Sequence, residues 1–168
     1  MLILGLDPGT ATTGFGILNV IKSDFEVKEF GLIETEKNGY PSKRLFTIHK
    51  ELSLLIKTFK PDVIAIEKLF FYNNAKTAMR VGQAQGVMLY CAEEHQTAIF
   101  EYAPAQIKKM ISGNGRADKK LMQKSIRKLL GNGVRSRPKK RTHFDNAADA
   151  LAVALTHAIN IGEFTIEQ

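Results

Sequence analysis

The spacing of apolar residues changes along the chain, and this change restricts the possible fold more than any other feature. Residues 2–6 (LILGL), 14–21 (GFGILNVI) and about 25–33 are apolar stretches with short gaps between them, which is typical of antiparallel hairpins. Over residues 41–60 the apolar side chains recur every three or four positions instead, which predicts an amphipathic helix. The chain must therefore bury a hairpin sheet and a helix in one core.

Strands and helices alternate through the rest of the chain. The continuous apolar run VIAIE (63–67) predicts a strand that is buried on both faces, and residues 97–102 predict a fifth strand. Residues 131–142 are expected to form a loop, because they contain Gly, Pro and five basic residues but no apolar period. This order predicts an α/β fold with a mixed five-stranded sheet flanked by helices. Further helices are expected over 74–95, about 104–111, 118–130 and 145–161.

The positive charge of the chain is concentrated in one third of it. Between Gln106 and Arg141 there are thirteen Lys and Arg residues and one acid, a local balance of +12, whereas the remainder carries −5. A basic region of this kind suits a polyanion such as nucleic acid, because each phosphate that it neutralises releases counterions.

Length and composition exclude several other classes. The 168 residues fit a single domain covering 1–168, and no apolar run approaches the roughly 20 residues of a membrane span. We expect no signal peptide, because the first residues lack a basic region and a cleavage-site pattern. The single cysteine, Cys91, predicts neither a disulfide nor a zinc site, and it fits a reducing cytoplasm.

Three acids stand where strands end or where a helix should pack. Asp7 ends the first predicted strand and Glu67 ends the fourth, so both would emerge at one sheet edge if these strands are parallel neighbours. Asp149 lies among small apolar residues of the last helix, where an unpaired carboxylate is costly. Such a cluster calls for a hard cation, Mg²⁺ or Mn²⁺, and two ions could act on a phosphodiester.

Each acid also has a simpler interpretation. Asp7 could be a turn residue, Glu67 a surface acid, and Asp145 the N-cap of the last helix. The combination of acids is more specific than any one of them.

Four ordered motifs make the chain resemble the RuvC crossover-junction endodeoxyribonucleases over nearly its whole length. The resemblance implies an RNase H-like fold, a homodimer that cuts Holliday junctions, and a divalent metal held by the catalytic acids Asp7, Glu67 and Asp149. It also implies a partnership with the RuvA–RuvB branch-migration complex. The motifs are LGLDPGTATTGFGIL (4–18), DVIAIEKLFFYNNAKTAMRVGQAQGV (62–87), FEYAPAQIKKMISGNGRADKK (100–120) and NAADALAVALTHA (146–158).

The fourth site position departs from the family pattern. Three residues before Asp149 the family usually has Asp or His, and this chain has Asn146, which offers a carbonyl oxygen without a charge. Asp145 is an alternative ligand, and His143 is a third candidate that lies outside the predicted helix. The sequence leaves this choice open.

The resemblance also implies several DNA contacts. Phe70 matches an aromatic residue that wedges against junction bases, although it could instead belong to the core or to a dimer contact. The expected phosphate contacts near the acids are Lys108 and Lys119, with Lys120 and Arg116 beside them.

Three other functions compete with the resolvase. LDPGTATTG is similar to a phosphate loop of the ATP-binding actin-like proteins, but their cleft needs about twice this length and there is no P-loop motif. A junction-binding protein without catalysis is favoured by the charge missing at Asn146. An RNase H-like RNA-processing nuclease would share the Asp-Pro-Gly start.

Overall fold

A mixed five-stranded sheet forms the centre of the protein. The computed structural model describes residues 1–22, 24–69, 75–131 and 141–165, and of residues 141–146 only the backbone is included. The strand order is β3-β2-β1-β4-β5, with β1, β2 and β3 antiparallel and with β4 parallel to both β1 and β5. The mixed sheet predicted from the sequence is confirmed. The strands are β1 (Leu2–Asp7), β2 (Thr12–Ile21), β3 (Asp24–Glu34), β4 (Val63–Glu67) and β5 (Ala98–Tyr102).

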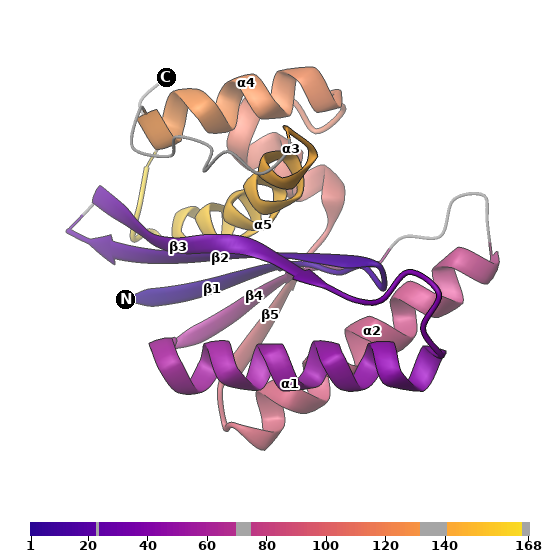
Figure 1. Ribbon diagram of the computed structural model, residues 1–168. Helices are drawn as coiled ribbons and strands as arrows, with labels where there is room; N and C mark the ends of the chain where they lie inside the picture. The colour runs from indigo at the N-terminus through magenta and orange to yellow at the C-terminus, as the bar shows by residue number, and fades with distance from the viewer. Residues whose placement is uncertain (23, 70–74, 132–140, 166–168) are drawn as a thin grey trace.

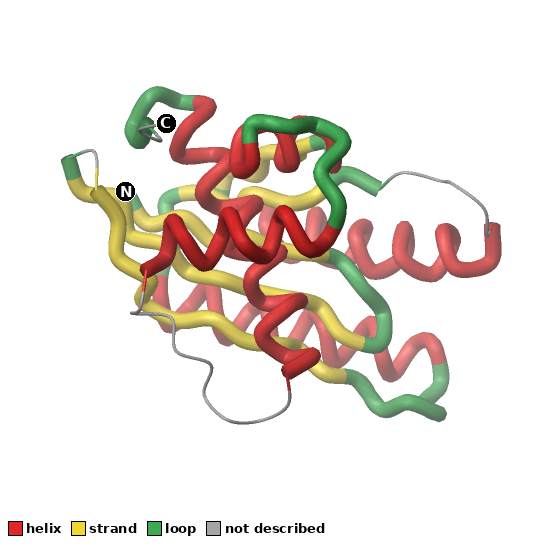
Figure 2. Tube along the Cα trace, turned by 90° about the horizontal axis from the view of Figure 1, so that it is seen from above, coloured by secondary structure: helices red, strands yellow, loops and turns green. Residues whose placement is uncertain are grey.

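Helices cover both faces of the sheet. Figure 1 shows α1 and α2 on one face and α3, α4 and α5 on the other, and Figure 2 shows the same layers from above. None of the helices that the structure describes is long and apolar enough to cross a membrane. The helices are α1 (Pro41–Phe59), α2 (Ala75–Glu94), α3 (Pro104–Ser112), α4 (Lys119–Leu130) and α5 (Arg141–Asn160).

The two faces are packed with side chains of different size. Large branched residues fill the core under α1 and α2, including Ile48 and Leu52, which are fully buried. The core under α5 contains many alanines, so the helix backbone lies very close to the strands. This difference in packing determines which helix can carry a functional side chain down to the sheet.

The N-terminal end of α5 corrects the sequence analysis. The helix begins at Arg141, four residues before the predicted start, so the assignment of residues 141 and 142 to a loop was wrong. His143 therefore lies within the helix, and Asp145 cannot be its N-cap. Once a helix has nucleated on its packed face, it can extend into residues that lack an apolar period. The remainder of the predicted loop, 132–140, lies outside the described residues.

Candidate active site

Asp7 and Glu67 lie at the same edge of the sheet. Strands β1 and β4 are parallel neighbours, and their register pairs Leu6 with Ile66, so the next residue on each strand is one of these acids. Their carboxyl groups are close enough for each to affect the pKa of the other. The predicted meeting of these acids is confirmed.

A tight turn holds Asp7 at the end of its strand. The chain reverses after Gly9, and a Cβ atom at that position would overlap the carbonyl oxygen of Thr12. The fully buried Thr13 donates a hydrogen bond of 2.8 Å from its Oγ1 atom to the carbonyl oxygen of Gly9. The Asp-Pro-Gly segment therefore fixes the exit of β1 as well as the turn.

Helix α5 brings Asp149 to this edge because small residues let it approach the sheet. A Cβ atom on Gly5 would overlap the carbonyl oxygen of Ala150 and would lie 2.9 Å from the Cβ of Ala154. A Cβ atom on Gly16 would meet the side chain of Leu151 at 2.5 Å. The close packing predicted from the small residues around Asp149 is thus observed.

The charges of the three acids oppose one another. Burial raises the pKa of Asp7 to about 8, from 3.8, and the negative charges of Glu67 and Asp149 contribute, while Lys119 acts in the opposite direction. The pKa of Glu67 is also raised, first by burial and then by Asp149, with Lys108 lowering it. The two carboxyls therefore hold at least one proton between them near neutral pH, until a cation replaces it.

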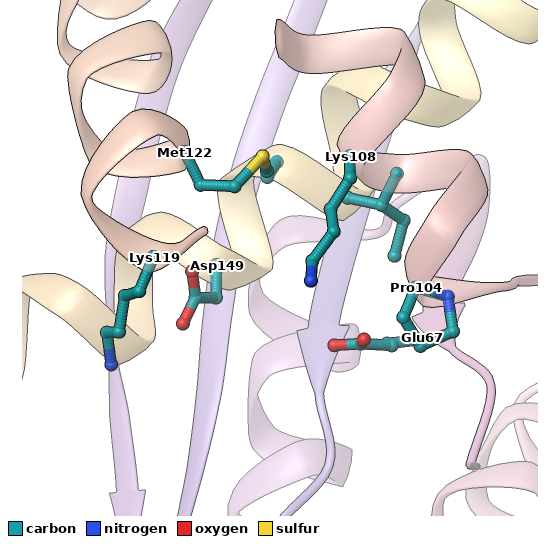
Figure 3. A pocket seen from close by; sticks show the side chains of 8 residues that line it. Glu67, Pro104, Lys108, Lys119, Met122 and Asp149 are labelled. Atoms are coloured by element: carbon teal, nitrogen blue, oxygen red, sulfur yellow. The ribbon is translucent and has the colours of Figure 1, made fainter. Parts of the chain in front are cut away.

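Two lysines face the acids across a cavity of about 210 Å³. Figure 3 shows the carboxylates of Glu67 and Asp149 pointing into this cavity, with the amino group of Lys108 between them and Lys119 beside Asp149. Lys108 lies on α3 and Lys119 is the first residue of α4. Both lysines predicted near the acids are brought to the site.

The position of Lys119 is not explained by helix stability. Asp118 caps α4 by accepting a hydrogen bond of 2.7 Å from the backbone N–H of Leu121. Lys119 and Lys120 follow in the first turn, where the helix dipole disfavours positive charge. Lys120 and Arg116 are exposed and do not line the cavity. Of these basic residues, only Lys119 lines the cavity with the acids.

Some predicted site residues lie outside the described part of the chain, and some residues at the site were not predicted. Phe70 lies outside the described residues, as do the side chains of His143, Asp145 and Asn146. Pro104 and Met122 line the cavity but were not singled out in the sequence. The available signal for Pro104 is that it begins α3 just after β5, whose Tyr102 pairs with Glu67.

The arrangement combines a cation site with an anion site. Three carboxylates whose charges oppose one another suit a hard divalent ion with oxygen ligands. The lysines beside these acids suit a phosphate group.

Comparisons with known proteins point to one family. The family described as crossover junction endodeoxyribonuclease RuvC matches residues 3–157. The RuvC protein of Alkaliphilus oremlandii is 44% identical over 165 residues, covering 98% of this chain and 96% of the relative. The structure of T. thermophilus RuvC in complex with Holliday junction substrate superimposes with a TM-score of 0.83 at 30% identity, covering 96% of this chain and 94% of the other.

A more distant structure supports the fold alone. The yeast mitochondrial Holliday junction resolvase Ydc2 has a TM-score of 0.68 at 16% identity and covers 92% of this chain and 76% of its own. With these neighbours, the RNase H-like fold implied by the sequence motifs is confirmed.

Proposed function

Because the chain belongs to the RuvC family of crossover junction endodeoxyribonucleases, we propose that it resolves four-way DNA junctions by paired, symmetric nicks in recombination and repair. Family membership makes it a nuclease, which hydrolyses phosphodiester bonds. The convergence of Asp7, Glu67 and Asp149 opposite Lys108 and Lys119 is the observation that carries the proposal.

The donor set fits Mg²⁺, with Mn²⁺ as a substitute. Asp7, Glu67 and Asp149 offer only oxygen atoms, and the raised pKa values of the first two support a site whose charged form would be stabilised by a bound cation. We infer that these residues hold two ions. Ions held by these residues would supply a water of lowered pKa and would neutralise charge on the leaving 3′ oxygen.

The protein side chains bind and orient the DNA strand. Lys108 and Lys119 face the carboxylates, so a phosphate in the cavity would contact both lysines while its ester bond faces the acids. Lys119 places positive charge where the phosphate gains negative charge during hydrolysis. Lys120 and Arg116, which are exposed, would extend this positive charge toward neighbouring phosphates. Hydrolysis leaves a 5′ phosphate and a 3′ hydroxyl.

Two further assignments rest on sequence position. The backbone of α5 places Asp145 one helical turn before Asp149, which supports Asp145 or Asn146 as the fourth ligand. Phe70, three residues after Glu67, is proposed as the aromatic wedge against the junction bases.

The outer surface of α2 supports a homodimer. Met79, Gln83, Gly86 and Tyr90 are exposed at helical spacing, and the exposed fractions of Met79 and Tyr90 are 67% and 63%. Nothing lies within 4 Å of a Cβ atom built on Gly86, so a second helix could approach closely there. A two-fold dimer on this face would present two cavities to the two opposed strands of a junction. The RuvA–RuvB complex is the proposed partner in branch migration.

The test of the catalytic proposal is cleavage of a synthetic mobile four-way junction in Mg²⁺. We expect paired nicks from the wild type, and a loss of about 1,000-fold in rate with retained binding for Asp7→Asn and Asp149→Asn. An equal loss for Asp145→Asn would identify it as the fourth ligand, and full activity would favour Asn146. A wild type that binds the junction but cuts it in neither Mg²⁺ nor Mn²⁺ would be a binding protein instead.

The test of the dimer compares two exposed tyrosines. Tyr90→Glu should dissociate the dimer in sedimentation, whereas Tyr40→Glu, at an equally exposed position before α1, should leave it intact. A fully active wild-type monomer would contradict the model of two linked incisions.

A further inference from the structure

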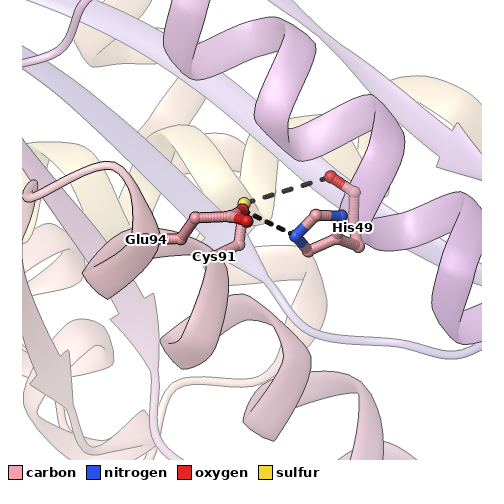
Figure 4. Close-up of side chains that lie close together, drawn as sticks. All are labelled: His49, Cys91 and Glu94. Atoms are coloured by element: carbon pink, nitrogen blue, oxygen red, sulfur yellow. Dashed lines mark hydrogen bonds and ion pairs between the residues drawn. The ribbon is translucent and has the colours of Figure 1, made fainter.

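A second group of metal-binding side chains lies between α1 and α2, on the face of the sheet opposite the acids. Figure 4 shows His49 of α1 beside Cys91 and Glu94 of α2. The Nε2 atom of His49 is 2.8 Å from the Oε2 atom of Glu94, and the ligand atoms of all three residues lie within 4.8 Å of one another. These residues are far from the cavity that holds Glu67 and Asp149, because the sheet separates them.

A fourth donor stands beside this group. The Nε2 atom of His95 lies 3.8 Å from the Oε2 atom of Glu94 and 3.1 Å from the Oγ atom of Ser53. The same hydroxyl lies 3.3 Å from the Sγ atom of Cys91. His95 therefore lies at the edge of the group formed by His49, Cys91 and Glu94, next to Glu94 and Ser53.

Helical spacing explains why these side chains meet. On α2, Glu94 and His95 follow Cys91 by three and four residues, so all three occupy one side of the chain as the helix ends. On α1, Ser53 follows His49 by four residues and faces the same side. The packing of α1 against α2 brings the two sets together.

We propose that His49, Cys91 and Glu94, with His95 in the fourth position, form a binding site for Zn²⁺ or a similar borderline-soft transition metal. Thiolate and imidazole donors select this class of ion, whereas the all-oxygen acid site selects Mg²⁺. Tetrahedral Zn²⁺ requires donor atoms roughly 3.3–3.8 Å apart. The 2.8 Å hydrogen bond from His49 to Glu94 would open by about half an ångström as the metal replaces its proton.

The donors are partly buried, which suits a structural metal ion that enters the site from solvent. The side chain of Cys91 is fully buried, whereas those of His49 and Glu94 are 29% and 41% exposed, so the site is reached from the rim of the two helices. Burial raises the pKa of the Cys91 thiol, and metal binding would therefore release its proton. The ion would join α1 to α2 and stabilise that half of the core.

A hydrogen-bonded network without metal is the competing explanation. The hydroxyl of Ser53 and the backbone carbonyl of His49 already give the Cys91 thiol polar neighbours, at 3.3 Å and 3.9 Å. The two explanations differ in whether sulfur bonds to an added ion, which is directly measurable.

The experiment is a titration of chelator-treated full-length protein with Co²⁺, followed by Zn²⁺ competition. We expect one equivalent per chain to give visible bands of tetrahedral cobalt and a sulfur-to-cobalt charge-transfer band, both removed by Zn²⁺. Cys91→Ser should abolish the charge-transfer band and weaken binding at least about 100-fold. Glu94→Gln should weaken it about 10- to 100-fold. The exposed neighbour Glu93 provides the matched control, because Glu93→Gln leaves all donors in place.

A second measurement guards against a variant that fails to fold. Zn²⁺ should raise the melting temperature of the wild type and of Asp7→Asn equally, and this rise should vanish in His49→Gln, whose side chain is not fully buried. A titration without the charge-transfer band would overturn the proposal. So would a band that persists in Cys91→Ser, or a thermal shift that depends on Asp7 rather than on His49.

Discussion

The two faces of the sheet are packed with side chains of different size, and only one of them brings a helix backbone close to the strands. Under α1 and α2, large residues such as Ile48, Leu52 and Met88 fill the space between helix and strand. Under α5, Gly5 and the alanines beside Asp149 bring the helix backbone against the strands. Large side chains therefore stabilise the first face by apolar burial, whereas small ones on the second face fix the distance between α5 and the strands.

This difference shows why the acids gather on only one side. A helix separated from the sheet by full-sized side chains cannot place a short Asp side chain beside a strand end. The alanines around Asp149 bury less apolar surface than leucines would, and the acids oppose one another electrostatically. The packing under α5 therefore contributes less to the free energy of folding, and the larger core under α1 and α2 compensates for this.

The largest effect is expected where the close packing is broken. Gly5→Ala would drive a methyl group into the carbonyl oxygen of Ala150, so α5 must move away and take Asp149 with it. We expect a loss of about 3 kcal/mol or more in the free energy of unfolding, together with loss of junction cleavage. Urea unfolding and cleavage of the folded fraction measure the two effects.

The control for this change is another glycine-to-alanine substitution. A Cβ atom on Gly82 of α2 would make only an ordinary contact of 3.5 Å with Leu69. Gly82→Ala should therefore be neutral or stabilise the chain by about 1 kcal/mol. If Gly82→Ala lowered the free energy of unfolding as much as Gly5→Ala, the two faces would not differ in their tolerance of an added methyl group.

A matched pair of leucines tests whether stability and activity separate. Leu52 of α1 and Leu151 of α5 are both fully buried, and each truncation to Ala should cost about 3 kcal/mol of stability. At a temperature where both variants are folded, Leu52→Ala should keep the wild-type cleavage rate. Leu151→Ala should lose activity as well, because this side chain packs on Gly16 and sets the height of α5. Equal activity in the two variants would contradict the idea that packing under α5 positions the active site whereas packing under α1 affects stability alone.

The acid site should weaken the metal-free fold as pH rises. Folded Asp7 keeps its proton up to about pH 8, whereas the unfolded side chain releases it near 3.8, so the free energy of unfolding falls between these values. Asp7→Asn removes the contribution of Asp7 to this dependence, and at pH 8 it should exceed the wild type by up to about 5 kcal/mol while the two are similar at pH 4. Urea unfolding in a chelator at both pH values measures this difference.

The control for the pH experiment is Asp118→Asn, in which the amide oxygen can still cap α4. It should follow the wild-type pH dependence. A wild-type protein whose stability rises from pH 4 to pH 8 as steeply as that of Asp7→Asn would show that the acids do not oppose one another.

The sequence predicted the parts of this comparison that depend on local pattern. The apolar periods predicted the order of strands and helices along the chain and a mixed five-stranded sheet, and the run VIAIE placed Glu67 at a strand end. The start of α5 was predicted wrongly, because Arg141 and its neighbours show no apolar period although they continue the helix. A period marks the packed part of a helix and not its full length.

The group around Cys91 was beyond the sequence for a different reason. Its proposed ligands His49 and Glu94 are 45 residues apart in the sequence, and only the packing of α1 on α2 brings them together. The sequence analysis took Cys91 as an isolated thiol because it found no paired spacing of ligands along the chain. By contrast, Asp149 could be singled out from the sequence, because the small residues around it predict close packing of the helix against the sheet.

The smallest expected effect concerns Lys119, whose positive charge reduces the electrostatic repulsion among the acids. Lys119 lowers the pKa of Asp7 and lies in the first turn of α4, where the helix dipole disfavours it. In Lys119→Gln the cleavage rate at saturating Mg²⁺ should fall about tenfold, which is about 1.4 kcal/mol, because the phosphate loses a positive partner. The Mg²⁺ concentration for half-maximal rate should fall as well, since the cation loses a repulsive neighbour. Lys124→Gln, on the exposed side of the same helix, should change neither quantity. A rise in the Mg²⁺ requirement would mean that Lys119 supports the metal-binding acids by position, and that its charge does not act on the phosphate.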